Sequence, residues 1–150
     1  MEINGLALML FCNNRRSPLC RGLWYNSPEK AHGGRTLEGI EKAHKAVEAA
    51  TDKLATDIVI LDMHKIGGFA DYFILCSGDS ARQISAIYEE VRHRLKKEGV
   101  MPHHYEGTVD SGWMLLDYGD VVVHVFSPEE REYYRLDELW SDAVPVLRIQ

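Results

Sequence analysis

The arrangement of apolar and polar positions predicts helices and strands from Thr36 onward. A first helix is predicted after Thr36, a residue that can cap a helix N-terminus. Its apolar stripe has the three- and four-residue spacing of one helix face and consists of Ile40, Ala43, Val47, Ala50 and Leu54. Two continuous apolar runs follow, at residues 57–62 and 71–76, and such runs are typical of strands covered on both faces.

A second helix is predicted from Ser80, because Ser80 and Gln83 have the spacing of a capping box. Gly99 is a suitable residue to end this helix. The apolar stripe between them consists of Ile84, Ile87, Val91 and Leu95. This spacing predicts a helix that packs one face on the two strands.

The remainder of the chain is predicted to form three strands and a final helix. The strands are expected at residues 103–106, 113–117 and 120–126, with a tight turn at Tyr118-Gly119. Ser127 begins the helix as its cap, before a proline at the first helical position. This helix is expected to run through Tyr133, Leu136 and Trp140, with Leu136, Leu139 and Ala143 in the core. The element order predicts an α/β fold, a mixed β-sheet packed with helices.

Residues 1–35 do not share this periodicity, and we expect a disordered or leader extension ahead of a domain at residues 36–150. Residues 6–11 are apolar, but the run is short and Glu2 stands where a secretory signal carries positive charge. The Arg-containing composition faintly resembles an organelle transit peptide. A disordered extension, or a start codon assigned too early, is the alternative interpretation.

The hairpin at residues 113–126 carries the most information about function. A two-residue Tyr118-Gly119 turn would place Asp117 opposite Asp120 and Trp113 opposite His124. Alternation then produces one purely apolar face and one mixed face. The apolar face holds Met114, Leu116, Val121, Val123 and Val125, and the mixed face holds Trp113, Leu115, Asp117, Asp120, Val122 and His124.

The mixed face has two interpretations that the sequence leaves open. Opposed carboxylates destabilise a hairpin, so a partner's Lys or Arg could neutralise Asp117 and Asp120. Alternatively, both acids flank the turn in water at little cost. A tryptophan among aliphatic and acidic residues is typical of an interface anchor. The alternative for Trp113 is burial under the N-terminal helix.

Composition narrows the class of partner. Residues 1–35 carry five Lys/Arg and two acids, whereas the remaining 115 residues carry 12 basic and 21 acidic side chains, a net charge of −9. Such a domain repels phosphates, so a basic protein is the expected contact and little direct nucleic-acid contact is expected. No run approaches the ~18 apolar residues of a membrane span. Three cysteines without a CxxC motif disfavour a disulfide framework and a zinc ribbon.

Candidate enzyme chemistry is incomplete in this sequence. A glycine pair ahead of Asp71 suggests a nucleotidyl transferase site, which needs two carboxylates one residue apart to hold two metal ions. Tyr72 and Phe73 follow Asp71, so the second carboxylate is missing. The seven histidines have no metal-ligand spacing, and Cys76 lies in an apolar run typical of inert core. We therefore expect no cofactor, no metal and no catalytic residue.

Five segments together resemble the ribosomal silencing factor (RsfS, or Iojap) family. They are residues 57–62, 70–78, Glu106-Gly107, residues 112–126 and residues 131–140. The resemblance covers about residues 38–145. It implies a fold related to nucleotidyl transferases without their active site. It further implies binding to a basic protein of the large ribosomal subunit at the surface where the small subunit docks, which blocks subunit joining and represses translation.

The partner-binding residues that we predict on this basis are Trp113, Leu115, Asp117, Tyr118, Asp120, His124, Tyr134 and Glu138. Two other classes of function remain as alternatives: a nucleotidyltransferase-like enzyme with an atypical site at Asp71, Asp117 and Asp120, and a scaffold that self-associates through the Trp113 face. A homodimer is a possible form of the free protein. A cytoplasmic location is expected, or a mitochondrion or plastid if residues 1–35 are a transit peptide.

Overall fold

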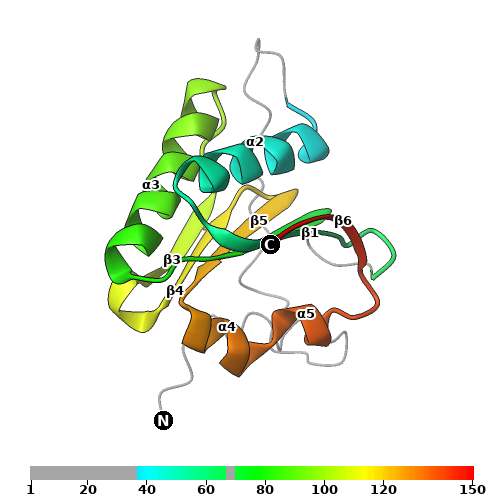
Figure 1. Cartoon of the computed structure of the whole chain (residues 1–150). Coiled ribbons are helices and arrows are strands. Elements are labelled where there is room, and N and C mark those ends of the chain that lie inside the picture. Colours follow the sequence, from blue (N-terminus) through cyan, green and yellow to red (C-terminus); the bar gives the residue numbers. More distant parts are fainter. Residues whose placement is uncertain (1–36, 67–69) are drawn as a thin grey trace, which may run out of the picture. The chain divides into compact units, whose positions relative to one another are not determined.

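A six-stranded mixed sheet with helices on both faces organises the chain (Figure 1). The computed structural model describes residues 37–66 and 70–150, so the predictions for residues 1–35 and for the Thr36 cap lie outside the described residues. The strand order is β3-β4-β5-β2-β1-β6, and only the β2–β5 pair is parallel. The strands are β1 Thr56–Asp62, β2 Tyr72–Ser77, β3 His104–Thr108, β4 Trp113–Asp117, β5 Val121–Phe126 and β6 Val144–Ile149. The α/β prediction is confirmed.

Two long helices, α2 (Gly39–Asp52) and α3 (Ala81–Lys97), cover one face of the sheet (Figure 1). The N-cap of α2 is Glu38, whose backbone N–H donates to the Glu41 carboxylate at 3.1 Å. The predicted Ser80 cap of α3 is confirmed, because Ser80 Oγ accepts from the Gln83 N–H at 3.2 Å. All four residues of the predicted α3 stripe are buried. These helices therefore pack the aliphatic side of the sheet.

The observed pairing of the hairpin strands is displaced from the predicted pairing by two residues. Trp113 lies opposite Phe126, and Asp117 lies opposite Val122. The Tyr118 N–H donates to the Val121 carbonyl at 2.8 Å, so the two turn residues follow Tyr118. Gly119 takes a left-handed φ of 88°, which suits glycine in this turn. Asp117 and Asp120 are therefore not opposed, and the prediction of their mutual repulsion is wrong.

The C-terminal segment is divided into more elements than predicted. The single helix is replaced by α4 (Pro128–Tyr134) and α5 (Leu136–Leu139), because Arg135 takes a left-handed conformation with φ 44°. Strand β6, which the sequence pattern missed, then adds to the outer edge of β1. A short 3₁₀ helix, Val109–Ser111, precedes β4 and was missed as well.

The sheet separates two layers of different composition. The layer under α2 and α3 is aliphatic and includes Ile60, Ile74 and Val123. The layer under α4 and α5 is aromatic, with ring contacts between Trp113 and Tyr134 and between Phe73 and Trp140. Because side chains alternate along each strand, neighbouring residues of one strand supply opposite layers.

Leu136 tests the assignment of α5 to the core. Leu136 is 1% exposed and Leu139 is 56% exposed, so the prediction of a core position is confirmed for Leu136 and wrong for Leu139. We expect Leu136→Ala to lower the free energy of unfolding by about 2–5 kcal/mol. Leu139→Ala, the matched control, should change it by less than about 0.5 kcal/mol. Urea titration measures both, and equal midpoints for the two variants would contradict the placement of α5.

Candidate partner-binding surface

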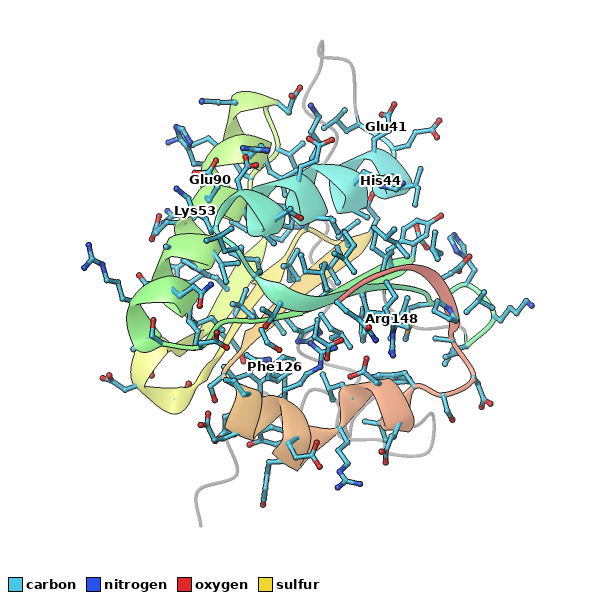
Figure 2. The ribbon with its side chains drawn as sticks, in the orientation of Figure 1. Glu41, His44, Lys53, Glu90, Phe126 and Arg148 are labelled. Atoms are coloured by element: carbon cyan, nitrogen blue, oxygen red, sulfur yellow. The ribbon has the colours of Figure 1, made fainter. Side chains whose placement is uncertain are left out.

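Trp113 belongs to an aromatic core and not to the surface. Its side chain is 1% exposed, and its ring stacks on Phe126 with centroids 4.9 Å apart. On the other side it meets the ring of Tyr134 from α4 at 4.6 Å. Figure 2 shows Phe126 between the sheet and α4. The prediction that Trp113 is exposed as an anchor is wrong. The burial alternative is correct, although the cover is α4 and not the N-terminal helix.

His124 completes this aromatic core as a neutral hydrogen-bond acceptor. It is fully buried, and the Trp113 Nε1–H donates to its Nδ1 at 3.2 Å. This acceptor role leaves the proton of the neutral ring on Nε2. Burial, together with the smaller effect of the positive charge of Arg131, lowers the pKa of His124 to about 3. His124 is therefore a structural residue and cannot contact a partner in this fold.

The remaining predicted residues of the hairpin also serve the fold. Leu115 and Tyr118 are buried. Asp117 is 7% exposed, and its carboxylate accepts the Gly119 N–H at 2.7 Å, which closes the turn. Asp120 binds Lys42 of α2 through both oxygens, at 2.9 and 2.8 Å. The cation that neutralises Asp120 is thus supplied by this chain, and the six predicted hairpin residues do not form an open interface.

Two of the predicted partner-binding residues lie on the C-terminal helices with accessible side chains. Tyr134 is half-buried, and the Glu138 side chain is 71% exposed. On α4, α5 and β6 the structure exposes large apolar side chains that the sequence prediction missed, namely Tyr133 at 66%, Leu139 at 56%, Val144 at 42% and Val146 at 47%. We refer to Tyr133, Glu138, Leu139, Val144 and Val146 as the C-terminal surface.

The helix break explains why this surface was missed. A continuous helix would have turned Leu139 toward the core, as its spacing from Leu136 suggests. The left-handed Arg135 instead restarts the helix in a new direction. The sequence signal that could have found Val144 and Val146 is the short β-branched run Val144-Pro145-Val146, because proline is tolerated on an edge strand.

The acids suggested for nucleotidyl transfer, Asp71, Asp117 and Asp120, each have a partner within this chain. Asp71 lies 3.6 Å from His64 Nε2, and Nδ1 of the same ring lies 2.7 Å from Asp62. The hydrogen bond that His64 donates to the Asp62 carboxylate raises the pKa of His64. Asp120 is bound to Lys42. Within residues 37–66 and 70–150, no group of three or more His, Cys, Asp or Glu side chains could hold a metal ion.

Two further sites bear on chemistry. Cys76 is buried, and burial raises the pKa of its thiol to about 12, which confirms the prediction of an inert core residue. An open cavity of about 440 Å³ lies at the N-terminal ends of α3 and α4, with Asp79, Asp110, Glu129 and Glu130 in its lining. In the described part of the chain, no helix is long and apolar enough to cross a membrane.

These features define an α/β domain that exposes apolar and acidic side chains on its C-terminal helices and edge strand. A family model described as "Ribosomal silencing factor during starvation" matches residues 36–150. The chain is 46% identical over 98 residues to the ribosomal silencing factor RsfS of Bacillus subtilis, which covers 65% of this chain and 83% of that protein. The chain therefore belongs to the ribosomal silencing factor (RsfS/Iojap) family.

Two other comparisons agree. A crystal structure of a protein from Chromobacterium violaceum is similar, with a TM-score of 0.68 and 39% identity over 70% of this chain and 88% of that one. A mouse protein named "Mitochondrial assembly of ribosomal large subunit protein 1" is 31% identical over 90 residues, 58% of this chain and 40% of that protein. The proteins similar to this chain therefore include bacterial proteins and one whose name is mitochondrial.

The neutral state of His124 predicts a pH dependence of stability. The unfolded chain protonates this residue near its ordinary pKa of about 6.5, whereas folded His124 does so only near 3. Between these values the unfolded state binds more protons, so the free energy of unfolding falls as the pH falls, at up to about 1.4 kcal/mol per pH unit. Urea titrations between about pH 7 and pH 5 measure the slope.

His124→Asn is the control for this slope, because asparagine can still accept from Trp113 Nε1 and does not titrate. The raised pKa of His64 acts in the opposite sense and is present in both proteins, so their difference isolates His124. Equal slopes for the two proteins would contradict the assignment.

The Lys42–Asp120 pair gives a second test of the hairpin. Side-chain exposure is 11% for Lys42 and 28% for Asp120, so Asp120→Asn leaves a largely buried ammonium without its partner charge. We expect a loss of roughly 1–2 kcal/mol in the free energy of unfolding. Glu89→Gln is the control, because its pair with Arg92 spans 3.8 Å on the surface. Unchanged or greater stability of Asp120→Asn in thermal unfolding would contradict a stabilising role for this pair.

Proposed function

We propose that this protein binds a basic protein of the large ribosomal subunit at the surface where the small subunit joins, and so represses translation. Membership of the silencing factor family is the observation that carries the proposal. The name of the mouse relative associates a member of the family with the large subunit. The net charge of −9 on residues 36–150 favours a basic protein partner.

The C-terminal surface is the docking site that the side-chain placement supports best. Large apolar side chains that lose their water at an interface supply most of its binding energy, and Leu139 and Tyr133 are exposed in this way. Charged groups around them set the rate and selectivity of association. Glu138, with its side chain 71% exposed, supplies that negative charge beside Leu139. Of the predicted residues, Tyr134 and Glu138 stay in this proposal.

The mechanism that follows is steric. A folded domain that occupies the joining surface excludes the small subunit for as long as it stays bound, and no covalent bond is made or broken. The degree of silencing then depends on occupancy, which is set by the affinity for the large subunit and by the concentration of the factor. We accordingly propose a regulatory protein without an enzymatic activity, cofactor or metal.

Location and self-association follow as smaller proposals. The bacterial relatives favour the cytoplasm, and the mitochondrial relative keeps an organelle as the alternative. A homodimer of the free protein through the C-terminal surface is proposed because Val144 and Val146 lie exposed on the edge strand β6. Sedimentation velocity of the free protein tests this, and a strict monomer at micromolar concentration would reject it.

Sedimentation with purified large subunits tests the proposed function. We expect the wild-type protein to move with large subunits on a sucrose gradient, and to reduce their joining with small subunits. Leu139→Ser should weaken binding by about tenfold or more, because it removes an apolar contact from the interface. Its matched control is Leu54→Ser, since Leu54 is 78% exposed after α2, on the other face of the sheet.

Two outcomes would contradict the proposal. Wild-type protein that stays at the top of the gradient at moderate salt would reject the large subunit as partner. Equal loss of binding by Leu139→Ser and Leu54→Ser, or by neither, would reject the C-terminal surface as the docking site while leaving the partner in place.

A further inference from the structure

The break between α4 and α5 is held by an ion pair that only the broken helix can form. Arg131 binds the Asp137 carboxylate through two guanidinium nitrogens. Nε donates to Oδ2 at 2.9 Å, and Nη2 donates to Oδ1 at 3.2 Å. In a continuous helix, residues six positions apart are separated by about 9 Å along the axis and lie on different faces. The pair is therefore specific to the conformation in which Arg135 is left-handed.

The sheet fixes the position of this pair. Arg131 is 8% exposed, and its Nη1 donates to the backbone carbonyl of Asp57 at 3.2 Å and to Ser77 Oγ at 3.4 Å. These acceptors lie at the start of β1 and at the end of β2. Asp137 is thus connected through one guanidinium to strands β1 and β2, so α5 is held at a defined place on the sheet.

Two other contacts support the position of α5 without enforcing the break. Leu136 of α5 is buried, but the predicted continuous helix also placed Leu136 in the core, so its burial does not require the break. Arg148 reaches from β6 toward α5 and lies 3.8 Å from Asp137, too far for a strong hydrogen bond (Figure 2). A four-residue helix cannot sustain itself, so α5 depends on such contacts.

The break decides which side chains reach the surface. In the broken form, Leu136 is buried whereas Glu138 and Leu139 project outward. In a continuous helix, Leu136 and Leu139 share a face and Leu139 turns toward the core. We propose that Arg131 and Asp137 are a positioning pair that selects the broken conformation and thereby exposes Glu138 and Leu139 of the C-terminal surface to the ribosomal partner. This inference rests on the proposed function.

The test compares Asp137→Asn with Asp142→Asn, which removes an equal charge from an exposed position just after α5. Asp137→Asn should weaken binding to large subunits roughly fivefold or more, at a temperature well below the melting temperature of both variants. Asp142→Asn should bind within about twofold of wild type. Hydrogen exchange should become faster at residues 136–140 in Asp137→Asn only.

Rescue separates positioning from mere charge. Asparagine tolerates the left-handed conformation better than arginine, so Arg135→Asn favours the break without the ion pair. Arg135 also contacts Glu132 at 2.8 Å and Glu138 at 3.5 Å, so Arg135→Asn alone is the reference for the double variant. Asp137→Asn should cost clearly less affinity in the Arg135→Asn background than in wild type.

Each outcome bears on the proposal. Equal binding by Asp137→Asn and Asp142→Asn, or an undiminished cost in the Arg135→Asn background, would overturn it. If Asp137→Asn does not fold, exchange in Arg135→Asn alone decides, because slower exchange at residues 136–140 is expected and unchanged exchange would overturn the inference. Failure of wild-type protein to bind large subunits, with the exchange effects present, would reject the proposed function and leave the conformational role of the pair in place.

Discussion

The α4–α5 side of the domain depends on the hydrogen bonds and the ion pair that the buried guanidinium of Arg131 makes. One side chain, 8% exposed, joins β1, β2, α4 and α5 through donors to a backbone carbonyl, a hydroxyl and a carboxylate. An arginine suits this position because its planar fork of donors can satisfy several acceptors at once. Removing one partner from such a buried pair typically costs about 3–5 kcal/mol, because it leaves the other charge uncompensated.

The charge of Arg131 also shapes the chemistry of its neighbours. It acts with burial to lower the pKa of His124, which keeps the imidazole neutral and able to accept from Trp113. It acts against burial at Cys76, where burial prevails and the thiol stays protonated. The aromatic layer therefore contains polar side chains that are neutral and unreactive. Its hydrogen bonds and ring contacts orient Trp113, and Trp113 in turn supports Tyr134 of α4.

Much of the fold could be predicted because its elements have strong local signals. The α3 stripe and the Ser80 cap follow from spacing alone. The predicted hairpin register was wrong because two overlapping dipeptides that share Gly119 could both form the turn. The two registers nevertheless put the same residues on the same face. The apolar face was thus predicted correctly although every pair was displaced. The break at Arg135 could not be predicted, because the sequence does not reveal that Arg131 contacts both the sheet and Asp137.

The candidate site was the part most poorly predicted, and the reason is physical. A mixed face with Asp117, Asp120 and Trp113 was interpreted as a surface because carboxylates normally lie in water. In the structure, the Asp117 carboxylate accepts a hydrogen bond within its own turn and Asp120 pairs with Lys42, so neither acid needs a cation from another protein. The proposed function, occupation of a surface, requires no catalytic group at a fixed spacing. Its docking site depends on which apolar side chains remain uncovered after folding, and here a single left-handed residue decides whether Leu139 is one of them.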